Sequence, residues 1–328
     1  MKAIIPVAGS GTRLRPHTLT KPKVLLNVAG KPIIHHIIEQ IIDEKLVDEI
    51  ILVVGTMSDK IIDYVSQTFD FKFSFPTQNQ AMGLGHAINC AKHCVNKDDD
   101  ILIILGDTLF DVDLKKFCNT SYSRIGLKKV SDPRRFGVAE INNNVITKFV
   151  EKPANKGISP SNDAIVGIYY FKNSSALFDS LDNLINSGIK TKGEFQLTDA
   201  LTLLLENGEI FSPYYVEGWL DCGKVETILE TNKYLLNKFK LNYKFDGSII
   251  KEPVFIGKDT ILENCIIGEN VTIGKNCVIK NSIIKNSIIE DYSNIENSVL
   301  ANTLMGEHSS IIGKIKELNI GDYCETID

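Results

Sequence analysis

The sequence predicts an α/β fold, a doubly wound and mostly parallel sheet, followed by a short parallel β-helix. Two observations support this prediction. In the first half of the 328 residues, short apolar runs alternate with segments of helical periodicity, the pattern of successive strand–helix–strand units. From about Val254 to Gly313, paired apolar residues return every five or six positions between Gly, Asn, Glu or Lys.

The first part of the chain alternates between expected strands and expected helices. Strands are expected at Lys2–Val7, Glu49–Val54, Phe71–Phe75 and Asp100–Leu105, and helices at Lys31–Glu44, Ser58–Phe69 and Gly83–Cys94. In the first of these helices, isoleucines recur at helical spacing and Pro32 suits the first turn. Because parallel strands need crossover connections, this order predicts a mostly parallel sheet with helices on both faces.

The second part is richer in strands. Strands are expected at Ile125–Val130, Phe136–Ile141, Val145–Val150, Ala164–Phe171 and Ile210–Val216, and helices at Ser174–Ile185, Gln196–Leu205 and Lys224–Leu236. Asn142, Asn143 and Asn144 are expected to form a hairpin turn, because asparagine tolerates positive φ.

The five- to six-residue repeat near the end predicts one short strand per repeat, with each coil burying its isoleucines against the next. A β-sandwich is the alternative, but it usually has longer strands and turn signals every 8–12 residues. Roughly three coils fit the repeat. We expect two domains, residues 1–240 and 250–328, with the boundary within Lys238–Ser248.

The composition argues against several classes of protein. A net charge of −5 disfavours a nucleic-acid binder, and no apolar run approaches the ~20 residues of a membrane span. The first strand begins almost at the N-terminus, which leaves no signal-peptide pattern. The seven cysteines are scattered, without a C-x-x-C pair, as in a reducing cytoplasm. We therefore expect a cytoplasmic protein with no nucleic-acid or membrane partner.

The loop after the first strand has the composition of a phosphate-binding loop. Gly9 and Gly11 let backbone N–H groups approach an anion, and Arg13 and Lys23 supply two cations nearby. The loop is not a Walker loop, and Leu14 stands where the Rossmann fingerprint has its third glycine. A nucleoside triphosphate is the predicted ligand, and the alternative is a tight turn with surface cations.

Further polar residues stand at expected element ends. Asp107 follows an apolar strand, where a carboxylate can hold Mg²⁺ or simply bond to its own turn. Asp221 precedes a helix and could be its N-cap. Gln78 precedes a glycine turn at Gly83 and could donate to and accept from a pyrimidine edge, or cap the following helix. His86 lies beyond this turn, and no catalytic role is required of it.

The string G-x-G-T-R-L-x-P, followed by Pro22-Lys23, resembles the signature of the sugar nucleotidylyltransferases, or nucleotide-sugar pyrophosphorylases. The resemblance covers nearly the whole chain and is closest to glucose-1-phosphate thymidylyltransferases and uridylyltransferases. It implies a Rossmann-like nucleotidyltransferase domain followed by a left-handed β-helix. It also implies a Mg²⁺-dependent reaction in which a nucleoside triphosphate and a sugar 1-phosphate give an NDP-sugar and pyrophosphate.

The resemblance implies a role for each site residue. Arg13 and Lys23 would be catalytic, with Lys23 acting on the α-phosphoryl group and Arg13 on the departing pyrophosphate. Asp107 and Asp221 would hold the metal. The nucleotide would contact Ala8, Gly9, Ser10, Gly11, Thr12, Gln78, Gly83 and Gly106. The sugar phosphate would contact Gly137, Glu151, Lys152, Gly167 and Glu194.

The favoured substrates are dTTP or UTP with glucose 1-phosphate. Ala8-Gly9 stands where many thymidylyl-transferring members have two glycines, and an ADP- or GDP-sugar pyrophosphorylase is the alternative. A regulatory subunit without activity is a second alternative. A bifunctional acyltransferase is a third, disfavoured because the repeat has a single histidine, His308, near its end. A homo-oligomer is expected because the open last coil needs a cap.

Overall fold

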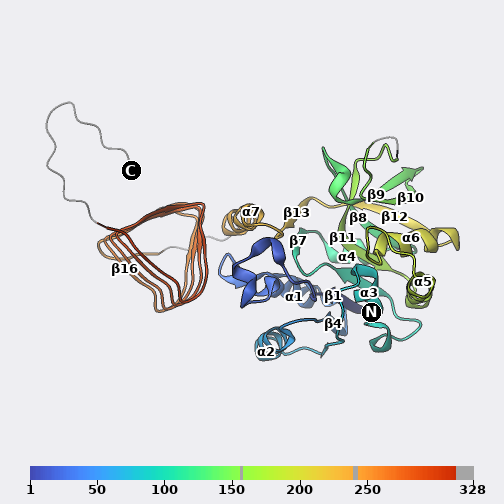
Figure 1. Ribbon diagram of the computed structural model, residues 1–328, viewed down its shortest axis with the longest axis horizontal. Helices are drawn as coiled ribbons and strands as arrows, with labels where there is room; N and C mark the ends of the chain where they lie inside the picture. Colours follow the sequence, from blue (N-terminus) through green and yellow to red (C-terminus); the bar gives the residue numbers. More distant parts are fainter. Residues whose placement is uncertain (156–157, 239–242, 315–328) are drawn as a thin grey trace. The chain divides into compact units, whose positions relative to one another are not determined.

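The computed structural model describes residues 1–155, 158–238 and 243–314, and it divides into two compact units (Figure 1). The first comprises Met1–Leu26 and Lys31–Thr227, and the second comprises Asn27–Gly30 and the chain from Ile228 onward. The division falls inside helix α7 (Val225–Leu236). The predicted boundary, Lys238–Ser248, lies partly outside the described residues, because 239–242 are not among them.

The first unit is built on a nine-stranded sheet with the N-terminal strand inside it. β1 (Lys2–Pro6) pairs in parallel with β4 (Glu49–Val53) and β6 (Ile101–Ile104), and β4 pairs in parallel with β5 (Phe73–Ser74). Every residue of β4 and β6 is buried, which explains why β4 after Glu49 and the whole of β6 are continuous apolar runs rather than alternating ones. These four strands confirm the predicted parallel sheet.

The remaining strands of this sheet add mostly antiparallel pairs. β11 pairs antiparallel with β6, β8 and β9, β9 pairs antiparallel with β10, and β12 runs parallel to β8. Their bounds are Ser123–Lys129 (β8), Gly137–Asn142 (β9), Val145–Glu151 (β10), Asp163–Phe171 (β11) and Phe211–Tyr215 (β12). The β9–β10 hairpin confirms the predicted turn, since Asn143 and Asn144 have φ angles of 48° and 61°.

Helices cover both faces of the sheet. Ile4 and Ile51 share a buried cluster with residues of α3, α5 and α6, which places these helices on one face. Their neighbours Ala3 and Ile50 are equally buried and point the opposite way, so the other face is covered too. The α-helices are Ile33–Glu44 (α1), Ser58–Thr68 (α2), Leu84–Asn89 (α3), Leu114–Cys118 (α4), Ser174–Ser187 (α5) and Leu197–Glu206 (α6).

Several elements differ from the prediction. The helix expected from Lys31 begins at Ile33, because Lys31–Pro32 forms the short strand β3. The helix expected over Gly83–Cys94 is α3 followed by a separate 3₁₀ turn, Lys92–Cys94. The strands β7 (Thr108–Asp111) and β13 (Gly218–Asp221), which pair with each other, were not predicted. Each is only four residues long, and its partner lies far away in sequence.

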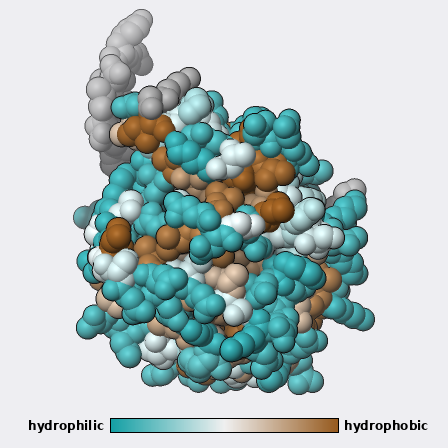
Figure 2. All heavy atoms as spheres, turned by 90° about the vertical axis from the view of Figure 1, so that its right-hand side faces the viewer, coloured by the Kyte–Doolittle hydropathy of each residue, from teal (hydrophilic) through white to brown (hydrophobic). Residues whose placement is uncertain are grey.

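One face of the first unit is mainly polar. Figure 2 shows one side of it as largely hydrophilic, broken by apolar patches. Within the described residues, no helix combines the length and the apolar character that crossing a bilayer requires.

The repeat region of the second unit is a parallel β-helix. Within residues 243–314 its strands form three parallel sheets of four strands each, which makes four coils where roughly three were expected. The first coil begins at β14, before the Val254 at which the predicted repeat starts. The strand bounds are Ile249–Ile250 (β14), Val254–Ile256 (β15), Ile261–Glu263 (β16), Ile266–Ile267 (β17), Val271–Ile273 (β18), Val278–Lys280 (β19), Ile283–Lys285 (β20), Ile288–Ile289 (β21), Asn294–Glu296 (β22), Val299–Ala301 (β23), Leu304–Met305 (β24) and Ser310–Ile312 (β25).

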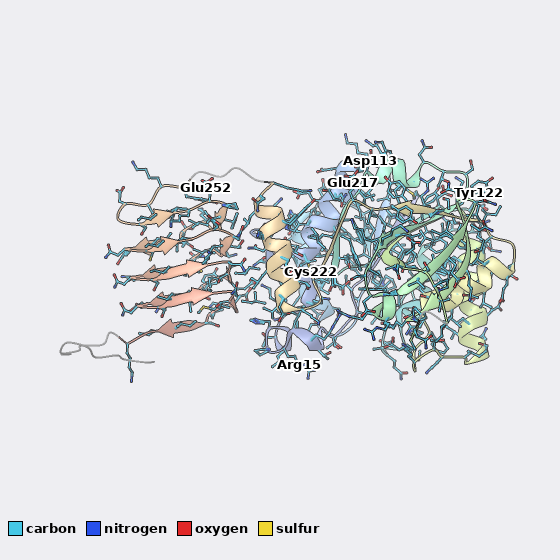
Figure 3. The ribbon with its side chains drawn as sticks, turned by 90° about the horizontal axis from the view of Figure 1, so that it is seen from above. Arg15, Asp113, Tyr122, Glu217, Cys222 and Glu252 are labelled. Carbon is cyan, nitrogen blue, oxygen red and sulfur yellow. The ribbon has the colours of Figure 1, made fainter. Side chains whose placement is uncertain are left out.

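Asparagines make many of the turns between these strands. Seven adopt positive φ between 44° and 63°: Asn264, Asn270, Asn276, Asn281, Asn286, Asn297 and Asn302. Several of their amides also bond to the next coil, as Asn264 does to Asn281 at 3.3 Å and Asn281 to Asn297 at 3.2 Å. Figure 3 shows the coils stacked in layers. The turn residues therefore set the backbone and link the layers.

Asn232 of α7 is the most heavily bonded buried amide of the second unit. It has no solvent exposure. Its Oδ1 accepts from the Ala29 N–H at 2.8 Å and from the Thr272 hydroxyl at 2.6 Å, and its Nδ2 donates to the Asn270 carbonyl at 3.1 Å. Ala29 belongs to the short segment with strand β2 (Asn27–Val28). One side chain thus joins α7, this segment and the β-helix within the unit.

Replacing Asn232 by alanine should lower the free energy of unfolding by about 2–4 kcal/mol, because buried donors and an acceptor lose their partner. Urea unfolding followed by circular dichroism measures the change. Asn237→Ala is the matched control, since Asn237 is exposed at the end of the same helix and should stay within about 0.5 kcal/mol of the parent. Equal stability of the two variants would contradict the role given to Asn232.

Candidate active site

The glycine loop after β1 lines a cavity of about 520 Å³. Within the described residues, the backbone N–H groups of Ala8 to Thr12 donate to no protein acceptor. A 3₁₀ turn, Thr12–Leu14, follows the loop, and the Thr18 hydroxyl donates to the Gly11 carbonyl at 2.8 Å. The loop is therefore held from its carbonyl side while its N–H groups stay available to an anion. Phosphate binding by this loop stays a prediction.

Gly11 and Gly9 serve this loop differently. Gly11 has a φ of 61°, and a Cβ there would lie 2.9 Å from Thr18 Cγ2 and 3.1 Å from Lys23 Cβ. At Gly9 a Cβ would meet nothing within 4 Å. Backbone geometry and close packing thus require glycine at position 11, whereas position 9 is open toward the cavity.

Lys23 and Asp107 form an ion pair beside the loop. Lys23 lies on the 3₁₀ turn Lys23–Leu25, is nearly buried, and places its Nζ 2.5 Å from Asp107 Oδ2. Burial favours the neutral acid at Asp107, but the Lys23 ammonium more than compensates, so the pKa of Asp107 lies below its usual value. Both residues were expected at the site, but their pairing was not predicted from the sequence.

Asp221 is brought next to Asp107 by the β7–β13 pair. Asp221 lies opposite Thr108 in the register, and the Cys222 N–H donates to the Asp107 carbonyl at 3.0 Å. Burial raises the pKa of Asp221, and the negative charge of Asp107 raises it further. Two carboxylates more than a hundred residues apart in sequence are therefore neighbours, as the predicted metal pair requires.

Arg13 completes this charged group. A Cβ built on Gly223 would lie 2.9 Å from both Arg13 Nη2 and Asp221 Oδ1. The guanidinium and the carboxylate therefore meet at the same glycine. Arg13, Lys23 and Asp107 line the cavity next to the unbonded N–H groups, and Asp221 lies beside Asp107 without being part of the lining.

Gln78 lies at another part of the cavity wall. Its N–H donates to the Val54 carbonyl at 2.8 Å, and its side-chain Nε2 lies 3.1 Å from the Gly83 carbonyl and 2.9 Å from His86 Nδ1. Gly83 has a φ of 110°, and a Cβ there would lie 2.6 Å from the Phe195 carbonyl. Only glycine allows this turn to pack so closely.

One of the five residues predicted to bind the sugar phosphate lines this cavity, and the other four do not. Glu194 lines it and accepts from Gln196 Nε2 at 3.0 Å. Glu151 accepts from the Thr198 hydroxyl at 2.7 Å and pairs with Lys152 at 3.0 Å, and neither lines the cavity. A Cβ on Gly137 would lie 2.9 Å from Thr198 Oγ1 and 3.1 Å from Glu151 Oε2.

Gly167 and Gly106 have close packing contacts. A Cβ on Gly167 would lie 2.5 Å from Leu105 Cδ1, and one on Gly106 would lie 2.6 Å from Val7 Cγ1. Neither residue lines the cavity. These contacts are with residues that directly follow β6 and β1, so a direct contact of Gly106 with the nucleotide stays a prediction.

Some polar residues around the site were missed. Thr18 and Thr198 hold Gly11 and Glu151, and no motif marks a lone threonine. Asp199 has one buried carboxylate oxygen without a partner in the described part of the chain, and burial raises its pKa. The roles of these residues can be recognised only in the folded structure, where their partners lie close to them.

Two family models match the chain. One described as nucleotidyl transferase matches residues 2–238, and one described as bacterial transferase hexapeptide (six repeats) matches residues 247–281. The bifunctional protein GlmU of Methanococcus maripaludis (strain C7) is 38% identical over 268 residues, which are 81% of this chain and 62% of that protein. The chain thus spans less than two thirds of that relative's length.

Other relatives match over most of both chains. Glucose-1-phosphate thymidylyltransferase of Streptomyces antibioticus is 31% identical, over 98% of this chain and 86% of that protein. The low-salt glycan biosynthesis nucleotidyltransferase Agl11 of Haloferax volcanii is 31% identical, over 90% and 89%. A solved structure of UDP-glucose pyrophosphorylase complexed with UDP-glucose is similar, with a TM-score of 0.62 and 26% identity over 73% of this chain and 99% of that chain.

Replacing Gly11 by alanine should lower the free energy of unfolding by about 1–3 kcal/mol, because an alanine is strained at this positive φ and its Cβ meets Thr18. Gly9→Ala is the control and should leave the stability unchanged, since its Cβ has open space. Denaturant unfolding without ligands measures both. A Gly11→Ala variant as stable as Gly9→Ala would show that the loop does not need this conformation.

Proposed function

Since the chain belongs to the nucleotidyl transferase family, we propose that it transfers a nucleotidyl group from a nucleoside triphosphate to a sugar 1-phosphate. The products would be an NDP-sugar and pyrophosphate. One observation carries the proposal: the unbonded N–H groups of Ala8 to Thr12, Arg13 and Lys23 line the same cavity. Such a cavity is suited to a polyphosphate rather than to a neutral or cationic ligand.

The proposed reaction mainly requires neutralisation of the negative charges on the two phosphate substrates. The attacking phosphate oxygen of the sugar 1-phosphate is already an anion, so no general base is needed. The barrier is the approach of two polyanions in line at the α-phosphorus. Lys23 would meet the charge on the α-phosphoryl group, Arg13 the charge on the departing pyrophosphate, and the loop N–H groups would hold the triphosphate.

The carboxylates of Asp107 and Asp221 fit a hard cation such as Mg²⁺. They are neighbours, and the mutual repulsion that raises the pKa of Asp221 would be relieved by a cation. Within the described residues, no three His, Cys, Asp or Glu side chains are grouped to hold a metal by themselves, as is usual for Mg²⁺ completed by water and phosphate oxygens. Bound Mg²⁺ would supply further neutralisation of the phosphates.

We propose dTTP or UTP as the donor and glucose 1-phosphate as the acceptor. Gln78 lines the cavity and is suited to a base edge, and relatives are named for thymidylyl transfer and for UDP-glucose. Glu151, Lys152 and Glu194 would serve the sugar phosphate. An ADP- or GDP-sugar pyrophosphorylase, or an inactive regulatory subunit, is the alternative. The convergence of Arg13, Lys23, Asp107 and Asp221 favours an active enzyme over the inactive subunit.

We also propose a homo-oligomer. In the β14–β17–β20–β23 sheet, Ile249, Ile266, Ile283 and Val299 lie in register, and Ile249, Ile283 and Val299 are exposed. A second copy of the chain could cover such a column. The cytoplasmic location expected from the composition stays a prediction.

Pyrophosphate release should be measured with ATP, GTP, CTP, UTP and dTTP, each with glucose 1-phosphate and Mg²⁺. The panel is then repeated with other sugar 1-phosphates. Activity confined to UTP or dTTP is the expected outcome. A preference for ATP or GTP would keep the reaction and overturn the donor, and no turnover with any pair would favour the inactive subunit.

Replacing Lys23 by alanine should lower kcat about 100-fold or more and change KM less, because the charge that Lys23 meets develops in the transition state. Steady-state kinetics with the preferred pair measures both constants. Lys97→Ala, which removes an exposed lysine outside the cavity lining, is the control and should leave both unchanged. A near-normal kcat in Lys23→Ala would show that Lys23 does not stabilise the transition state.

A further inference from the structure

The side-chain amide of Gln78 is held in one orientation by the chain itself. Its Nε2 faces the Gly83 carbonyl at 3.1 Å and His86 Nδ1 at 2.9 Å. A carbonyl oxygen can only accept, so the amide atom that faces Gly83 is the nitrogen and not the oxygen. The orientation is therefore determined by the protein and does not depend on a bound nucleotide.

The contact with His86 fixes the state of the imidazole. The Gln78 amide carries two hydrogens, and one of them serves the Gly83 carbonyl. The other points to His86 Nδ1, which accepts it only when its own proton is on Nε2. Burial, with a smaller contribution from the charge of Lys190, lowers the pKa of His86 and so favours this neutral ring.

With both amide hydrogens engaged, Oε1 is the polar atom of Gln78 that remains for a base. Gln78 lines the cavity together with Gly83 and Leu84, although its side chain is largely buried. Gln78 was expected both to donate to a base and to accept from it, and in the structure its Oε1 remains as an acceptor. An acceptor pairs with the ring N–H of uracil, thymine or guanine. It would be repelled by the unprotonated ring nitrogen of cytosine or adenine, because both atoms are acceptors.

We propose that His86 is a positioning residue for nucleotide selection, which holds Gln78 with Oε1 available to the base so that a nucleotide with a ring N–H is preferred. The inference rests on the proposed function and gives a physical reason for a donor of this class, to which UTP and dTTP belong. His86 itself does not contact the reacting phosphates. His86 affects which nucleotide base the site accepts. It does not affect the rate of transfer from the preferred nucleotide.

The test compares His86→Leu with His86→Asn. Leucine fills similar space without an acceptor, whereas the asparagine carbonyl can take the place of Nδ1. The readout is the ratio of kcat/KM for UTP over CTP, because these two bases differ at the ring nitrogen and its neighbouring group. We expect this ratio to fall about tenfold in His86→Leu, with kcat for UTP within a few-fold of the parent, and to recover in His86→Asn. His93→Leu, a change at an exposed histidine outside the cavity lining, is the control.

Two kinetic outcomes would overturn the proposal. One is an unchanged ratio in His86→Leu. The other is an equal loss of activity with every nucleotide, which would indicate a purely structural role. If the parent protein turns over no nucleotide, the proposed function fails instead, and calorimetric titration of UTP and CTP into the same variants still tests the preference.

A measurement independent of activity tests the contact itself. In ¹⁵N spectra of the imidazole groups, His86 should be neutral with its proton on Nε2, and its signal is identified by its loss in His86→Asn. A His86 ring protonated on Nδ1 at pH 7 would contradict the proposed hydrogen bond to Gln78. It would also contradict the proposed role of His86 in base selection.

Discussion

The ion pair between Lys23 and Asp107 is the contact on which the geometry of the candidate site depends. It joins the segment after the glycine loop to the end of β6, across 84 residues of sequence. The Lys23 side chain is 10% exposed and that of Asp107 35%, so the pair is partly shielded from water. Removing either partner would leave a poorly solvated charge, which destabilises a protein more than the loss of a surface pair. The pair therefore keeps a cation and a carboxylate beside the loop N–H groups.

The balance of charge explains why the site would bind a triphosphate together with a divalent cation. Arg13, Lys23, Asp107 and Asp221 carry two positive and two negative formal charges, so the side chains alone do not neutralise a triphosphate. The unbonded loop N–H groups add partial positive charge only. A divalent cation on the carboxylates would turn this neutral group into one that attracts a polyanion. Gly223 allows the arrangement, because a side chain there would separate Arg13 from Asp221.

Local signals in the sequence predicted most of the fold, and long-range pairing accounts for the rest. The buried runs of β1, β4 and β6 and the asparagine hairpin could be recognised from their own residues. The β7–β13 pair could not, because short strands carry little periodicity and their partners are distant. The same limit applies to the site: composition marked the glycine loop, but the joining of Asp107 to Lys23 and of Gln78 to His86 depends on the folded chain.

Left-handed backbone occurs both around the candidate site and at the β-helix turns, and the surroundings explain why glycine supplies it at the first and asparagine often at the second. At Gly11, Gly83 and Gly167 a Cβ would come within 2.9 Å of another atom, so only glycine fits. At the β-helix turns the same φ region is occupied by asparagine, which pays a smaller steric penalty there than most residues. Asparagine also carries an amide that bonds to the turn of the next coil. Glycine therefore marks crowded positions around the candidate site, and asparagine marks positions where a side chain can link repeated layers.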